Sequence, residues 1–237
     1  MSEPINFSLQ SRLADMGMCV TFVYATGKPN AESLMCTKYW QLAQRKIMDL
    51  DDPGALLQHP HILGYRALHK TCGVSDPNLV PSPESLITLL LKAGELRSIE
   101  PIVDLYNAVS LNHLISIGAH DAAKLGGELR LSMNSGGERF QPIGQKKKIT
   151  LPAEEYSYKA ADHKPVCRLE CKQSNESKLR ADTKRWVFIL QGNENIDGTV
   201  LETAATELLY LVQSHWADVR TAQATLDSQN LTATLLL

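Results

Sequence analysis

The clearest structural signal in the chain is Trp186-Val187-Phe188-Ile189-Leu190, a continuous apolar run rich in strand-forming residues. A short apolar run that is bounded by turn residues is consistent with a buried strand. The turn residues Gln191-Gly192-Asn193 follow this run, and Asp197-Gly198 then opens a helical pattern. The stretch therefore predicts a buried strand that leads through a short turn into a helix.

Outward from this stretch, helical patterns come first and strand patterns second. Apolar residues recur at helical spacing in four segments, which are 34–50, 62–70, 82–93 and 99–114. A strand pattern over 18–24 precedes them and ends at the turn Gly27-Lys28-Pro29-Asn30, and two further strand patterns, 129–133 and 166–171, follow them. Helices, then strands, then one closing helix predict a layered α+β domain.

Three short segments carry expectations of their own. Ser82 precedes Pro83 at the start of the third helical pattern, and we expect its hydroxyl to cap that helix. The stretch His59-Pro60-His61 is expected to form a loop with a solvated histidine pair rather than a metal site. The apolar tail 231–237 needs covering, either as a strand against the domain or by a second subunit.

Composition excludes several classes of protein. Of the 237 residues, 43% are hydrophobic and 21% are charged, as in globular domains. No apolar run approaches the roughly 20 residues needed to cross a bilayer, and the first residues do not resemble a secretory signal. Five scattered cysteines without an export signal predict reduced thiols. We therefore expect a cytoplasmic protein and exclude membrane, secreted and fibrous classes.

Charge is unevenly distributed along the chain. The formal net charge is −2, but residues 139–185 carry 12 Lys and Arg against 6 Asp and Glu, and the rest of the chain is acidic. A basic segment on an acidic body suits one anionic partner at one place. The alternative is that loops and edge strands are simply rich in lysine.

No common catalytic or cofactor motif is present in the sequence. It contains no phosphate-binding glycine loop, dinucleotide fingerprint, HExxH or Gly-x-Ser-x-Gly. Cys167 and Cys171 lack zinc-site spacing, so we expect buried core thiols, no metal and no cofactor. His120-Asp121 offers an imidazole beside a carboxylate, next to Gly118, where a ligand can approach the backbone. Alternatively, Asp121 caps the next turn and His120 packs beneath it.

Several ordered motifs resemble one family. Val103-Asp104-Leu105-Tyr106-Asn107-Ala108-Val109-Ser110-Leu111 and Ile117-Gly118-Ala119-His120-Asp121 look like the B3/B4 domain, the editing domain of the phenylalanyl-tRNA synthetase beta subunit. Gly64-Tyr65-Arg66, Pro81-Ser82-Pro83-Glu84, Gly137-Glu138-Arg139-Phe140 and Cys167-Arg168-Leu169-Glu170 match other parts of the pattern in the expected order. The resemblance covers roughly residues 60 to 215 and extends to free-standing bacterial relatives of that domain.

The resemblance implies a fold and an activity. It implies a three-layer β/β/α sandwich over 61–237, against which residues 1–60 pack as an N-terminal strand and helix. In the synthetase this domain hydrolyses phenylalanine tRNA that carries tyrosine, because a binding pocket alone rejects near-isosteres weakly. The chain is accordingly expected to deacylate a mischarged aminoacyl-tRNA in trans, as a monomer or weak dimer whose partner is tRNA rather than DNA or a membrane. Two alternatives remain, a non-catalytic module that binds an amino acid or tRNA end, and an interaction scaffold.

The resemblance also assigns roles to residues. It places catalytic groups at Asn107, His120 and Asp121, and substrate-binding groups at Gly118, Ala119, Glu138, Glu170 and Ser174. Candidates for phosphate contact are Arg168, Lys172, Lys178, Arg180, Lys184 and Arg185. Compared with the synthetase, the pocket histidine is displaced by two positions, and Ser177-Lys178 stands where a glutamate reads the tyrosine hydroxyl. The resemblance therefore leaves the amino acid open.

Overall fold

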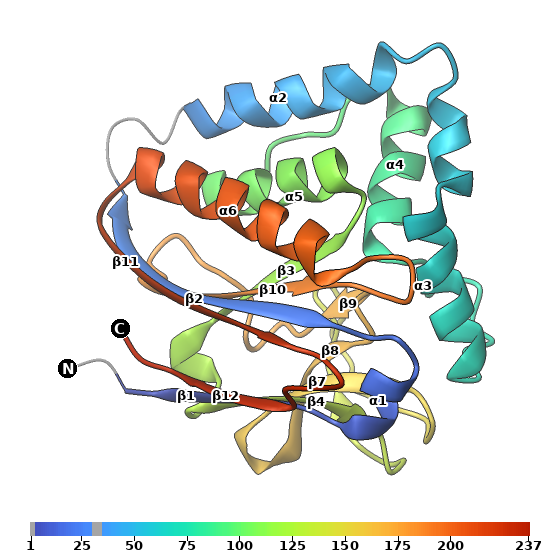
Figure 1. Cartoon of the computed structure of the whole chain (residues 1–237), viewed down its shortest axis with the longest axis vertical. Helices are drawn as coiled ribbons and strands as arrows, with labels where there is room; N and C mark the ends of the chain where they lie inside the picture. The colour runs from blue at the N-terminus through green and yellow to red at the C-terminus, as the bar shows by residue number, and fades with distance from the viewer. Residues whose placement is uncertain (1–2, 30–34) are drawn as a thin grey trace.

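The structure, a computed structural model, describes residues 3–29 and 35–237 in three layers. A layer of helices covers a four-stranded sheet, and a six-stranded sheet lies beneath that sheet (Figure 1). This arrangement is a β/β/α sandwich, so the predicted fold class is confirmed. Within the described ranges, no helix is both long enough and apolar enough to span a membrane.

The middle layer is the four-stranded sheet, in which all neighbouring strands are antiparallel. Its strands, in spatial order, are β11 (Trp216–Leu226), β2 (Val20–Pro29), β10 (Arg185–Gln191) and β3 (Ser116–Asp121). The predicted apolar run of 186–190 is β10, which is hydrogen-bonded on both sides. Strand β3, which carries the His120-Asp121 step, is an edge of this sheet.

The lower layer is the six-stranded sheet, which joins both ends of the chain. Its strands, in spatial order, are β12 (Thr232–Leu235), β1 (Ile5–Leu9), β4 (Glu128–Met133), β7 (Tyr156–Ala160), β8 (Lys164–Arg168) and β9 (Lys172–Gln173). The pairing of β1 with β4 is parallel, and the other pairings are antiparallel. The apolar tail is thus covered as a strand of the sheet. The N-terminal segment contributes to both sheets, through β1 and β2. Strands β5 (Arg139–Phe140) and β6 (Ile149–Thr150) form a separate ribbon.

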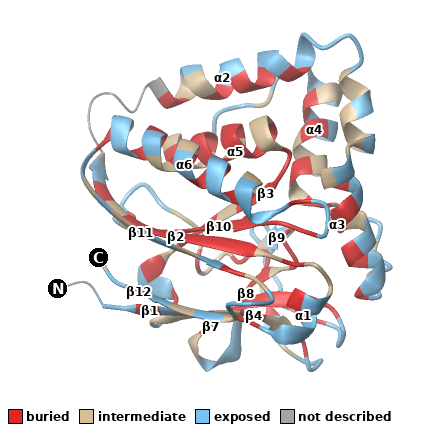
Figure 2. Cartoon of the chain, viewed as in Figure 1, coloured by how far each residue is buried: buried red, intermediate tan, exposed pale blue. Residues whose placement is uncertain are grey.

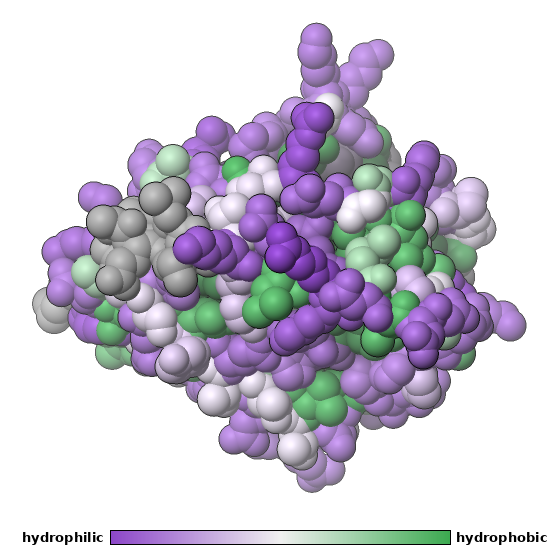
Figure 3. All heavy atoms as spheres, turned by 90° about the horizontal axis from the view of Figure 1, so that it is seen from above, coloured by the Kyte–Doolittle hydropathy of each residue, from purple (hydrophilic) through white to green (hydrophobic). Residues whose placement is uncertain are grey.

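The helices form the upper layer and one end of the molecule. Helices α2 (Met35–Met48), α5 (Pro101–His113) and α6 (Gly198–His215) lie over the four-stranded sheet, while α3 (Pro60–Thr71) and α4 (Ser82–Ala93) stand beside it (Figure 1). Short helices α1 (Ser11–Asp15), η2 (Pro53–Gln58), η3 (Ala122–Lys124) and η4 (Ala161–His163) lie in connections. Seen from above, the surface is mostly hydrophilic with small separated apolar patches, as expected where amphipathic helices turn their polar faces outward (Figure 3).

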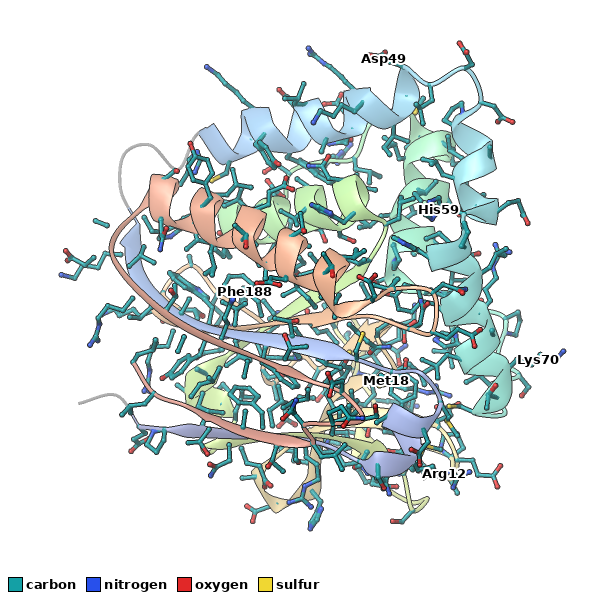
Figure 4. All side chains as sticks on the ribbon, in the orientation of Figure 1. Arg12, Met18, Asp49, His59, Lys70 and Phe188 are labelled. Carbon is teal, nitrogen blue, oxygen red and sulfur yellow. The ribbon has the colours of Figure 1, made fainter. Side chains whose placement is uncertain are left out.

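Alternate residues of β10 belong to two of the three core clusters in the described part of the chain, one above and one below the four-stranded sheet. In β10, Phe188 packs with residues of α5 and α6, whereas Val187 and Ile189 join the cluster between the sheets. Figure 4 shows Phe188 on the helical side of the sheet and Met18 between the two sheets. Successive side chains of a strand point to opposite faces, so β10 contributes to both clusters. Buried residues accordingly line the facing surfaces of all three layers (Figure 2).

Several local expectations from the sequence are wrong. The predicted turn at 27–30 is part of β2 as far as Pro29. Asn30 lies outside the described residues, as does Leu34 at the start of the predicted helix 34–50. His59 is not in a loop but caps α3, because its ring accepts a hydrogen bond from His61 N. Ser82 lies inside α4, and its hydroxyl bonds Ser116 Oγ at 2.8 Å instead of capping the helix. The strand predicted over 166–171 ends at Arg168.

Glu207 joins the helices of the upper layer and carries a pH-dependent part of the stability. The His113 ring, the Tyr39 hydroxyl and the Asn112 amide all hydrogen-bond to its carboxylate. Burial opposes ionisation, but the hydrogen bonds from His113, Tyr39 and Asn112 lower the pKa of Glu207 to about 2. Since this pKa is depressed, its contribution is complete above about pH 4.5 and is lost as the pH falls toward 2.

Glu207→Gln is therefore expected to lower the free energy of unfolding by about 1–2 kcal/mol at pH 7, after discounting for partial exposure. The difference from wild type should shrink at pH 3 and be smallest near pH 2. Denaturant unfolding at these pH values measures it. Glu202→Gln, at an exposed position of α6, is the control. An equal loss at every pH would contradict the assigned role.

Candidate functional site

A cavity lies between the two sheets, where the edge strands β3 and β9 approach each other. Its volume is about 210 Å³, which exceeds the roughly 150 Å³ that suffices for a benzene molecule. Helices α4 and α5 also contribute residues to its lining. The residues that line it are Ser82, Ser85, Leu86, Tyr106, Asn107, Ser116, Ile117, Gly118, His120, Tyr158, Cys167, Glu170, Cys171, Gln173 and Ile189.

Strand β3 provides one wall of the cavity. Gly118 and His120 face it, whereas Ala119 between them packs into the cluster beneath the helices. A side chain added at Gly118 would meet only Gln173 Nε2, at 3.8 Å from its Cβ, so the backbone here is open to a ligand. The Gln173 amide donates to the Ala119 carbonyl and thereby ties β9 to β3. The wall therefore combines an accessible backbone with one imidazole.

His120 is a neutral hydrogen-bonding group at this wall. It is fully enclosed, and its Nδ1 lies 2.9 Å from Ser177 Oγ. Burial lowers the pKa of the His120 imidazole to about 4. Near pH 7 the ring is therefore uncharged and weakly basic, so it is suited to orienting a water or a carbonyl rather than to storing a proton.

A buried polar network lies behind the opposite wall, to which Glu170 and Tyr158 contribute. The His69 imidazole donates to Glu170 Oε1 at 2.7 Å, and the Tyr156 hydroxyl donates to the other carboxylate oxygen. The side chain of Gln191 donates from Nε2 to the Tyr156 hydroxyl at 3.0 Å, and its Oε1 accepts from the Tyr158 hydroxyl. Each buried polar group of the network thus has a hydrogen-bond partner within it, as buried polar groups require.

The charges of this network stabilise each other. Burial alone would raise the pKa of the Glu170 carboxyl, but His69 and the Tyr156 hydroxyl hold it below its ordinary value. Burial likewise opposes the charge on His69, yet the Glu170 carboxylate raises the pKa of that imidazole. Glu170 is therefore an ionised, fully partnered group at the cavity wall.

The structure brings together four of the residues that the sequence predicted for the site. Asn107 from α5, Gly118 and His120 from β3, and Glu170 from the turn after β8 all line the cavity. Their positions in sequence are up to 63 residues apart, between Asn107 and Glu170. Only the fold makes them neighbours.

Other predicted site residues lie outside the cavity. Asp121 caps η3, where its carboxylate accepts from Ala123 N at 3.0 Å. Glu138 accepts from Ser135 N at 2.8 Å and pairs with Lys159 at 3.3 Å. Ser174 Oγ accepts from Glu176 N at 3.1 Å. These residues support the loops around the site, and the alternative that Asp121 caps the next turn matches its observed contact.

The predicted phosphate-binding residues differ in their surroundings. The Arg168 guanidinium forms a bidentate ion pair with the Glu155 carboxylate, at 2.6 and 2.7 Å. This pairing leaves the guanidinium less available to a phosphate. Lys172 is exposed on β9, and Lys178 is half-buried. The remaining three lie together in a surface hollow beside Asp121, the residue that follows His120, and they are Arg180, Lys184 and Arg185.

Four residues that line the cavity or lie directly behind its wall were not predicted for the site from the sequence. His69 lies on the buried face of α3. A polar residue at a position where the helical periodicity predicts an apolar one could have indicated a buried partner. Tyr156 and Tyr158 are two residues apart, so a strand places both on one face, but β7 was not recognised as a strand. Cys171 lines the cavity from the turn after β8.

Comparisons with known proteins place this geometry in a family. No curated protein sequence matches the chain. Among solved structures, an N-terminal fragment of the phenylalanyl-tRNA synthetase beta subunit from Pyrococcus horikoshii is similar, with a TM-score of 0.51, 12% identity and 92% of this chain covered. The chain spans about half of that fragment, 53% of its length. A family model for the B3/4 domain matches residues 70–214. The chain therefore belongs to the B3/4 domain family.

Proposed function

We propose that this chain is a tRNA-associated editing protein that hydrolyses the ester of a mischarged aminoacyl-tRNA in trans. The observation that carries the proposal is the cavity between the sheets of a B3/4 domain, which Asn107, Gly118, His120 and Glu170 line together. Similarity to the synthetase beta-subunit fragment supports the association with tRNA. The aminoacyl group would occupy the cavity and the terminal ribose its mouth.

Hydrolysis of an aminoacyl ester requires few catalytic groups from the protein. An aminoacyl ester is already activated, so holding one water beside its carbonyl and donors near its oxygen accounts for much of the rate. His120 offers a neutral ring nitrogen, Asn107 an amide and Gly118 an open backbone. A hydroxyl of the terminal ribose can assist. Burial raises the pKa of the Cys171 thiol well above its ordinary value, so this thiol is not a nucleophile near pH 7.

Two observations favour a second candidate function. The pKa of His120 is about 4, and both carboxylate oxygens of Glu170 are occupied by His69 and Tyr156. Neither group is then a strong base toward a bound water near pH 7. The same cavity suits a module that binds an aminoacyl end, or a free amino acid, without turning it over.

Deacylation of a panel of mischarged tRNAs tests the proposal, with purified protein and phenylalanine tRNA carrying tyrosine isomers among the substrates. We expect turnover of at least one member and a loss of about 10²-fold in His120→Asn, since a positioned donor contributes on this scale. His163→Asn, at an exposed position outside the cavity, should retain the wild-type rate. Flat traces from folded wild-type protein would reject editing and favour the binding module.

The surface hollow of Arg180, Lys184 and Arg185 is expected to contact phosphates of the tRNA. Throughout residues 3–29 and 35–237, no salt bridge engages these three side chains. Replacing all three with glutamine should weaken tRNA association at least tenfold and reduce the slope of log K against log salt by about 2. Filter binding at several salt concentrations measures both quantities.

The matched control replaces three exposed cations of α2 with glutamine, and they are Lys38, Arg45 and Lys46. This variant changes the net charge by the same amount on the helical side of the molecule. Equal losses in the two triple variants would show that net charge, rather than the hollow, governs association.

A further inference from the structure

Three side chains of metal-binding type converge beside the cavity, and two of them line it. His69 comes from α3, while Glu170 and Cys171 come from the turn between β8 and β9. His69 Nε2 lies 2.7 Å from Glu170 Oε1 and 3.9 Å from Cys171 Sγ, and Cys171 Sγ lies 3.5 Å from Glu170 Oε1. In the part of the chain that the structure describes, no other such trio has its donor atoms within 4.8 Å of one another.

We propose that His69, Glu170 and Cys171 form a binding site for one divalent transition-metal ion of the zinc type, with a fourth position open to the cavity. Imidazole nitrogen, thiolate sulfur and carboxylate oxygen are the ligands that zinc takes, at about 2.0–2.3 Å. Tetrahedral bonds of that length separate ligand atoms by roughly 3.3–3.6 Å. The two spacings that involve sulfur are close to this range, and the third reaches it when an ion replaces the shared proton.

The surroundings hold the ligands in place. The Tyr156 hydroxyl donates to the carboxylate oxygen that faces away from His69, and the His69 ring also hydrogen-bonds to the backbone of Leu79. Such outer contacts fix the orientation of metal ligands and strengthen binding. His69 and Glu170 are only 5% and 8% exposed, so bulk water competes weakly for the ion. Since Glu170 and Cys171 line the cavity, a water molecule can complete the coordination.

The charge balance favours a divalent ion. Without metal, the Nε2–H of His69 and the S–H of Cys171 both point to Oε1 of the Glu170 carboxylate, at 2.7 and 3.5 Å. When the ion binds, a metal–nitrogen bond replaces the Nε2–H bond and a metal–sulfur bond replaces the S–H bond. Two protons leave to solvent as two positive charges arrive. The buried cluster therefore keeps its net charge, which avoids the large cost of adding charge to the interior.

Cobalt titration of the metal-stripped full-length chain tests the site, because Co²⁺ takes zinc ligands and reports thiolate coordination by a charge-transfer absorption band. Wild-type protein should bind one equivalent with this band, and Zn²⁺ should abolish it. Cys171→Ser should lose the band, and His69→Gln should bind at least tenfold more weakly. Cys167→Ser, which removes a neighbouring cavity thiol outside the trio, is the matched control and should behave as wild type.

No cobalt uptake by folded wild-type protein would overturn the proposal. So would a band that survives in Cys171→Ser or disappears in Cys167→Ser. Circular dichroism of each variant establishes that it is folded. If His69→Gln fails to fold, the comparison between the two serine variants still decides the outcome, because each changes a single sulfur to oxygen.

Discussion

Glu170→Gln is expected to lower the free energy of unfolding by about 3 kcal/mol at pH 7. The substitution removes the carboxylate that faces His69 at 2.7 Å and leaves a buried imidazole without its charge partner. Breaking a buried pair from one side costs this much because the remaining group is desolvated without compensation. Thermal and denaturant unfolding measure the change.

Asp218→Asn provides the comparison, since it removes the acidic member of a pair whose side chains are 73% and 69% exposed. Its unfolding midpoint should equal that of wild type, because exposed pairs contribute little. A Glu170→Gln protein as stable as Asp218→Asn would show that the network of His69, Glu170 and Tyr156 is not a source of stability.

Gly118→Val is expected to reduce deacylation at least tenfold while leaving the unfolding midpoint nearly unchanged. The new side chain would project into the cavity, where an added Cβ meets only Gln173 Nε2 at 3.8 Å. Little strain arises in the free protein, but the bound aminoacyl group and the valine methyl groups would compete for one space. The rate on the preferred mischarged tRNA and the melting temperature measure the two effects.

Gly198→Val is the matched control, because a Cβ at Gly198 meets nothing within 4 Å and this residue begins α6, outside the cavity. It should retain the wild-type rate. Full activity in Gly118→Val would mean that the substrate does not occupy the cavity wall formed by β3.

Elements with strong periodicity could be predicted from the sequence. The apolar spacing of α2 and α5 indicates helices, and the continuous apolar run of β10 indicates a buried strand. The same holds for Asp197, which accepts from Val200 N at the start of α6 as a cap should. These signals are local, so one sequence is enough to find them.

Elements defined by distant partners could not be predicted in this way. Strand β11 is 11 residues long, but it alternates weakly and contains a bulge between Ala217 and Arg220, and it was not recognised. Strand β9 has two residues and exists through its pairing with β8. Local propensity does not specify which sheet such segments join.

The candidate site shows the same division. Asn107, Gly118, His120 and Glu170 were identified through family resemblance, and the cavity brings them together. His69 was not identified, because its role depends on the carboxylate of Glu170, which is 101 residues away in the sequence. A buried histidine on a helix carries no local sign of its partner.

The cavity beside Gly118 and His120 is proposed to receive the aminoacyl end of a tRNA. Calorimetric titration with amide-linked aminoacyl-adenosines, which resist the ester hydrolysis, tests this binding whether or not the protein is an enzyme. We predict saturable binding of at least one member to wild type and to Gly198→Val, with at least tenfold weaker binding to Gly118→Val. No binding to wild type, or equal affinity in Gly118→Val, would show that this cavity does not receive the aminoacyl end.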